Sequence, residues 1–233
     1  MRRDILQETF RLLGRHFDLF TLIALTVWLP GHVVINYIDF FTLEKGAADA
    51  TARGFRVALS VEAVFGPLVV ASTLAALNRI ARGDPASYAQ ALVDGLVAWP
   101  RLFIARLVAS VLVLAGLIAL VVPGVVILVR LSFVDALVVL DGAPLGAALR
   151  ASNGLTQGRR LAIFWTGGVL FAAVFSVAMT LSMLAGAAHH FVVQVLADCV
   201  IAVTQTVFTI ALYLFYREAR AAPSVDTLRD GVV

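Results

Sequence analysis

The chain alternates long apolar runs with short polar segments. Six runs have this apolar character, and they cover residues 17–41, 57–80, 102–122, the stretch from Pro123-Gly124 to Leu140, 161–185 and 191–216. An α-helix rises about 1.5 Å per residue, so about 20 apolar residues cross the roughly 30 Å of hydrocarbon in a bilayer. The pattern therefore predicts an all-α integral membrane protein with six transmembrane helices.

The six predicted spans divide into three hairpins. A stretch of mixed polarity at helical spacing precedes each pair, and these stretches read DILQETFRLLGRHFDLF, SYAQALVDGLVAWPRLF and PLGAALRASNGLTQGRRLAIF. We expect each to begin as an amphipathic helix at the cytoplasmic membrane surface. The hairpins then form parallel repeats of one domain, in units of about 1–82, 83–141 and 142–220 before a polar tail at 221–233. The alternative is that any six-helix protein divides this way.

Basic residues gather on one side of the predicted spans. Arginines occur before span one, between spans two and three, between spans four and five, and after span six, whereas the opposite side has basic residues only in its first loop. Cytoplasmic loops carry the excess of Lys and Arg. We therefore expect a multi-pass protein of the bacterial cytoplasmic membrane with both termini in the cytoplasm. The first run is too long for the core of a signal peptide, so we expect it to stay in the mature chain.

Composition agrees with a membrane setting. Apolar residues make up 61% of the 233 positions, above the usual 45–50% of a soluble domain. The net charge of +3 is explained by arginines that flank spans and face anionic lipid, so we expect no nucleic-acid partner. The single cysteine, Cys199, excludes an intrachain disulfide and any site built from several cysteines.

A resemblance to a known family is visible in the segment VVPGVVILVRLSFVDALVVLDGAPLGAALRASNGLTQGRRLAIF. With ILQETFRLLGRHF near the N-terminus, this segment resembles the bacterial YciC-like family and the membrane domain of some glycerophosphoryl diester phosphodiesterases. The resemblance covers most of the chain and implies a membrane fold of largely unknown function. It does not imply the phosphodiesterase activity, because no soluble segment here is long enough for that catalytic domain.

Three charged residues are expected at similar depth inside the bilayer. Glu62, Arg130 and Asp198 each lie about 8–10 Å from the outer end of their predicted span. An unpaired charge at that depth is costly, so we expect Arg130 to pair with Glu62 or Asp198. The group could form an ion, proton or headgroup site that opens outward, or an ion pair that only fixes helix packing.

Three further charges lie along spans three and four. Asp135 is expected near the midplane on a different helix face from Arg130, either as a proton-carrying acid or as a hydrogen-bonded structural one. Arg106 and Asp141 mirror each other across the Pro123-Gly124 turn. We expect these two to form a structural pair near the cytoplasmic edge.

Polar residues before span five form the last group. They are a cytoplasmic docking surface or simply the end of an interfacial helix, and they comprise Arg150, Ser152, Thr156, Arg159 and Arg160. No catalytic or metal-binding motif is present in the sequence, and His189 and His190 point apart on a helix or turn. We therefore expect no catalytic residues, no metal and no cofactor.

Two hypotheses for function follow. The first is a non-enzymatic membrane scaffold, envelope factor or partner subunit, in contact with lipids and with a membrane-protein partner or a second copy of the chain. The second is a small transporter or lipid-handling protein that uses Glu62, Arg130, Asp135 and Asp198. A lipid-sized cavity that reaches the charged groups would favour the second.

Overall fold

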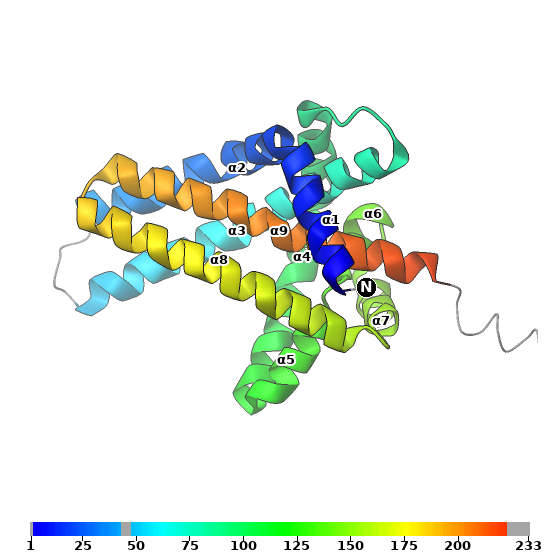
Figure 1. Ribbon diagram of the computed structural model, residues 1–233. Helices are drawn as coiled ribbons and strands as arrows, with labels where there is room; N and C mark the ends of the chain where they lie inside the picture. The colour runs from blue at the N-terminus through cyan, green and yellow to red at the C-terminus, as the bar shows by residue number, and fades with distance from the viewer. Residues whose placement is uncertain (1, 43–47, 223–233) are drawn as a thin grey trace, which may run out of the picture.

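The computed structural model describes residues 2–42 and 48–222, which are almost entirely helical and contain no strand (Figure 1). The helices are α1 (Arg2–Arg15), α2 (Phe17–Tyr37), the π-helical η1 (Ile38–Thr42), α3 (Ala48–Arg82), α4 (Tyr88–Ala119), α5 (Val121–Arg130), α6 (Val134–Leu140), α7 (Leu145–Leu155), α8 (Arg160–Ala188) and α9 (Phe191–Ala221). Six helical segments are long and apolar enough to cross a membrane. The prediction of an all-α architecture with six such segments is confirmed.

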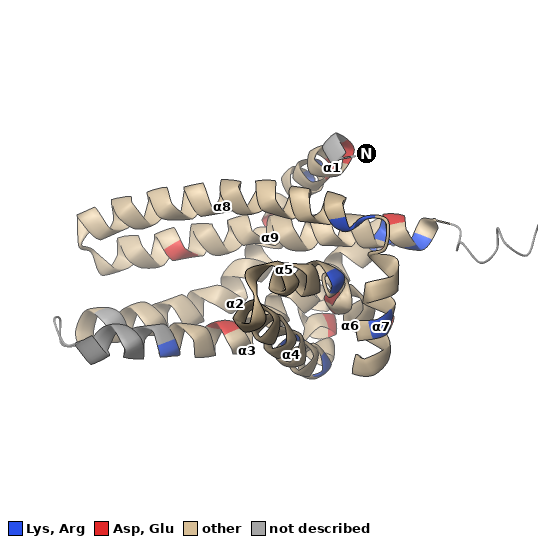
Figure 2. Cartoon of the chain, turned by 90° about the horizontal axis from the view of Figure 1, so that it is seen from below, with Lys and Arg blue, Asp and Glu red and all other residues tan. Residues whose placement is uncertain are grey.

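Four long helices, α2, α3, α8 and α9, lie side by side, whereas the tip of the α4–α5 hairpin points away from them at a steep angle (Figure 1). Seen from below, this hairpin is foreshortened while α8 and α9 lie across the view (Figure 2). Helix α1 packs near the C-terminal end of α9, so both lie at the same end of the molecule. Lys and Arg are concentrated toward that end (Figure 2). The polar tail beyond residue 222 lies outside the described residues.

Helix α4 differs from its prediction because it is one continuous helix of 32 residues. The expected boundary between an interfacial stretch at 88–99 and a span at 102–122 is absent, although Pro100 lies inside the helix. Close packing on α3 supports the continuous helix: Gly95 lies directly against Ser72, and the Trp99 indole N–H donates to the carbonyl of Val64 at 2.8 Å. At about 1.5 Å per residue, α4 is about 48 Å long, well over the thickness of the hydrocarbon core.

The fourth predicted span is broken. Residues 131–133 leave the helix between α5 and α6, which frees the carbonyl of Arg130 and the N–H of Phe133. The hydroxyl of Ser152 on α7 replaces both lost partners: it donates to the Arg130 carbonyl at 2.7 Å and accepts from the Phe133 N–H at 3.1 Å. Unsatisfied backbone groups are not tolerated in hydrocarbon, so this one side chain makes the break possible.

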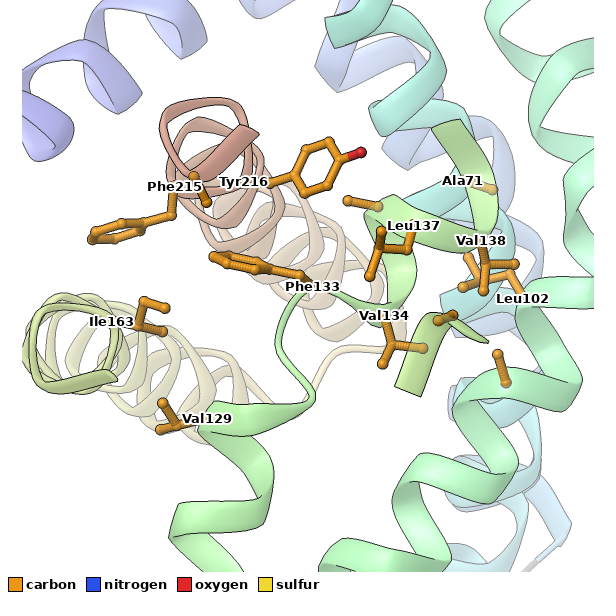
Figure 3. Close-up of a cluster of buried hydrophobic side chains, with 14 of the residues drawn as sticks. Ala71, Leu102, Val129, Phe133, Val134, Leu137, Val138, Ile163, Phe215 and Tyr216 are labelled. Atoms are coloured by element: carbon orange, nitrogen blue, oxygen red, sulfur yellow. The ribbon is translucent and has the colours of Figure 1, made fainter. Parts of the chain in front are cut away.

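A buried apolar cluster surrounds the break. The ring of Phe133 is fully buried and meets Tyr216 of α9 edge-on, with ring centroids 6.1 Å apart (Figure 3). Ile163 of α8 and Phe215 of α9 lie on its other sides (Figure 3). The residue at the break is therefore fixed by packing, in addition to the two hydrogen bonds from Ser152.

We expect Ser152→Ala to lower the free energy of unfolding by at least about 2 kcal/mol, because it leaves two buried backbone groups without partners. The measurement is reversible unfolding in mixed micelles. The matched control is Ser176→Ala, because the Ser176 hydroxyl bonds only to the Ala172 carbonyl one turn away in the same helix. That variant should stay within about 0.5 kcal/mol of the parent protein. Equal effects of the two substitutions would contradict the role given to Ser152.

Candidate functional site

An ion pair joins α4 to the start of α6. The Arg106 guanidinium donates to Asp135 Oδ2 from Nε at 3.1 Å and from Nη2 at 2.7 Å. The break at 131–133 places Asp135 in the first turn of α6, where it can face Arg106. Both side chains are about one quarter to one third exposed, at 24% and 34% for Asp135 and Arg106. The pair is therefore accessible from a cavity and is not sealed in the core.

A second carboxylate lies on the other side of the same guanidinium. Glu62 on α3 interacts electrostatically with Arg106. Gly66, one turn along α3, leaves the space between them: a Cβ placed on Gly66 would lie 3.0 Å from Glu62 Oε1 and 3.7 Å from Arg106 Nη1. The structure thus brings Glu62 and Asp135 together around Arg106, with two carboxylates for one cation.

Two cavities meet at Arg106. The larger, of about 720 Å³, lies between α4, α5, the start of α6, α8 and α9. Its lining is apolar except for Arg106, Asp135 and three hydroxyl groups, which belong to Ser110, Ser132 and Thr166. The smaller, of about 300 Å³, lies between α2, α3, α4, α8 and α9. Arg106, Phe171 and Phe208 line both cavities.

The smaller cavity is richer in polar groups. Its polar side chains are Glu62, Arg106, Gln205, Thr206 and Thr209. Among the described residues, the side chains of Gln205 and Thr209 have no hydrogen-bond partner, so both remain available to a bound molecule. Sequence reasoning missed these two residues, although a signal existed: they are polar, lie within a predicted span, and are four positions apart, so they share one helix face.

The predicted pairing of Arg130 with Glu62 or Asp198 is wrong. Arg130 is the last residue of α5 and is exposed, and its guanidinium has no ion-pair partner in the part of the chain that the structure describes. Arg130 ends α5 at the break, where its carbonyl accepts a hydrogen bond from Ser152 of α7, whereas α4 packs along α3 and brings Arg106 to Glu62. Asp198 instead accepts a hydrogen bond from the Asn36 amide at 2.7 Å, a partner on α2 that the sequence reasoning did not consider.

The predicted pairing of Arg106 with Asp141 is also wrong. Asp141 follows α6 and pairs with Arg220 on α9, and it accepts a hydrogen bond from the Tyr216 hydroxyl at 2.8 Å. The expectation assumed a straight fourth span, in which Asp141 would return beside Arg106. Because the helix breaks at 131–133, Asp135 takes that position and Asp141 faces α9.

The polar group before α8 is only partly available as a docking surface. Ser152 and Thr156 are fully buried, which removes both from such a surface. Ser152 supports the helix break, and the Thr156 hydroxyl donates to the Asn153 carbonyl at 3.1 Å. Arg160 is half-buried and donates to the side chain of Asn153 at 2.8 Å. Arg150 is exposed and Arg159 half-buried, and a docking role for the three arginines stays a prediction.

Known proteins do not identify this site. No family model, curated protein or solved structure matches the chain, so the YciC-like resemblance stays a prediction. Across residues 2–42 and 48–222, no group of three or more His, Cys, Asp or Glu side chains could hold a metal ion. The groups present at Arg106 are one guanidinium and two carboxylates, which offer charge and hydrogen bonds to a bound molecule.

The three charges should not contribute equally to stability. We expect Arg106→Gln to lower the free energy of unfolding by about 3–5 kcal/mol, because two carboxylates then lose their shared cation. Asp135→Asn should cost less, about 1–3 kcal/mol, because Glu62 still compensates Arg106. Unfolding in mixed micelles measures both.

The control for this comparison is Arg79→Gln. Arg79 donates to Asp94 at 2.8 Å, and the Asp94 side chain is 44% exposed. Exposed pairs contribute about 0–1 kcal/mol, so this substitution should have little effect. A cost for Arg106→Gln no larger than for Arg79→Gln would show that the carboxylates do not depend on the guanidinium.

Proposed function

We propose that this chain is a non-enzymatic, multi-pass membrane protein that binds a lipid-like amphiphile at the two cavities that meet at Arg106. The observation that carries the proposal is the contrast between them: an apolar space of about 720 Å³ adjoins a polar one of about 300 Å³ across a shared guanidinium. An amphiphile has the same division into an apolar and a polar part. Both volumes fall in the range of about 300–1,000 Å³ that is typical of small-molecule sites.

The walls of the larger cavity favour an acyl chain as its occupant. Leu114, Leu117 and Leu128 line the side formed by the α4–α5 hairpin, and Leu170, Phe171 and Phe215 line the opposite side. Water makes few hydrogen bonds with such walls, whereas a hydrocarbon chain has no hydrogen bonds to lose when it enters the cavity. This cavity reaches the charged groups, which favours the lipid-handling hypothesis over a pure scaffold.

The proposal also includes the membrane, the orientation of the chain in it and the interfacial helices. The concentration of Lys and Arg at the end that holds α1 and the end of α9 supports cytoplasmic termini in a bacterial cytoplasmic membrane (Figure 2). Helices α1 and α7 each precede a long apolar helix as separate elements, which supports two of the three interfacial segments. Because α4 is continuous, the second unit has no separate interfacial helix. The proposed threefold repeat is therefore supported by the three hairpins alone.

Filling part of the larger cavity should weaken binding. Gly168 on α8 lines it, and a Cβ added there meets no atom within 4 Å, so Gly168→Phe can be accommodated by the fold and occupies the space of the ligand. Displacing about two buried methylene groups costs about 1.6 kcal/mol, or roughly tenfold in affinity. Native mass spectrometry of the detergent-solubilised protein with added dioleoyl phosphatidylethanolamine measures the bound fraction.

The matched control is Gly186→Phe. Gly186 lies on the same helix, a Cβ there also meets no atom within 4 Å, and it lines neither cavity. This variant should bind lipid as the parent protein does. Equal lipid retention by the two variants would contradict binding in the cavity.

A further inference from the structure

Two carboxylates lie beside the single guanidinium of Arg106, and they lie next to different edges of it. Asp135 occupies the Nε and Nη2 atoms of the guanidinium. Nη1 makes no hydrogen bond within the described residues and lies on the side of Gly66 and Glu62. Arg106 lines the larger cavity together with Asp135 and the smaller cavity together with Glu62 and Gly66, so we assign its paired edge to the larger cavity and its free Nη1 donor to the smaller one.

Glu62 adds an unused acceptor beside that donor edge. Its carboxylate lines the smaller cavity and has no hydrogen-bond donor in the described part of the chain. A bound molecule in this cavity therefore meets one donor bearing positive charge and one acceptor bearing negative charge, only a few ångströms apart. Gln205 and Thr209 on α9 add uncharged groups to the opposite wall.

We propose that the smaller cavity recognises a zwitterionic headgroup that carries a phosphate and a primary ammonium group. The phosphate accepts hydrogen bonds from Arg106 Nη1, and the ammonium donates to Glu62. This inference rests on the proposed function, because it places the acyl chain of the same molecule in the larger cavity. It adds the chemical class of the polar part.

Charge and hydrogen bonding together separate this headgroup from three others. A headgroup with only a phosphate would place a second anion beside Glu62 with no compensating cation, in a site where charges are poorly screened. A headgroup with only a cation would leave Arg106 Nη1 without an acceptor. A quaternary ammonium has the right charge but no N–H to donate, so it forms the weaker contact with Glu62.

Competition between lipids in the detergent-solubilised protein tests the proposal. Dioleoyl phosphatidylethanolamine, dioleoyl phosphatidylcholine and dioleoyl phosphatidylglycerol are added in equal amounts, and native mass spectrometry counts each bound lipid. The parent protein should favour the ethanolamine lipid over the glycerol lipid by about tenfold, the value of one hydrogen bond to a charged group. Glu62→Gln should remove that preference without lowering retention of the glycerol lipid.

The control substitution is Asp198→Asn. Asp198 is another carboxylate in an apolar helix, but it is hydrogen-bonded to Asn36 and lines neither cavity. This variant should keep the headgroup preference of the parent protein. If both Asp198→Asn and Glu62→Gln lost the headgroup preference, the role given to Glu62 would be overturned.

The outcomes distinguish the two proposals. Binding of all three lipids without preference, weakened in Gly168→Phe, would overturn the headgroup assignment and leave the lipid site standing. A preference that survives Glu62→Gln would likewise overturn the assignment. Retention that is unchanged in Gly168→Phe would overturn the lipid site and the headgroup assignment with it.

Discussion

Backbone groups in hydrocarbon must find partners within the protein, and the break between α5 and α6 shows the consequences of that constraint. Ser152 replaces the hydrogen bonds lost by Arg130 and Phe133, which allows α5 to turn away from the bundle. The tip of the α4–α5 hairpin then points away from the long helices (Figure 1), and the larger cavity lies between this hairpin, α8 and α9. It also starts α6 at a point where Asp135 faces Arg106. The cavity and its ion pair therefore share one structural origin.

The ion pair limits what the cavity can contain. A guanidinium in an apolar wall is costly unless it is compensated, and Asp135 compensates it through two hydrogen bonds. Glu62 then has no cation of its own, so the site carries one more carboxylate than it needs for stability. A packing device alone would be complete with Arg106 and Asp135. The additional carboxylate, beside an unused guanidinium edge, is the feature that points to a ligand.

Sequence reasoning predicted the helices better than their contacts. Length and apolarity determine which segments can span a membrane, so the six segments were predictable from local pattern alone. The partners of Arg106 and Asp141 were not, because the prediction treated the fourth span as a straight helix. The break depends on Ser152, some twenty positions away, and on burial of Phe133 between α8 and α9. Such contacts between distant segments have no signature in the periodicity of either segment.

The same limitation explains why Glu62 and Asp135 were recognised as unusual while their common partner, Arg106, was missed. Their cost in hydrocarbon follows from residue type, so the sequence alone marks them. Depth estimates assumed that all spans lie along the membrane normal, which placed Arg106 at the cytoplasmic edge and Arg130 at the level of Glu62. In the structure α4 packs along α3 and brings Arg106 to Glu62, whereas Arg130 ends α5 and is exposed. Packing between helices therefore decides which arginine becomes the centre of the site.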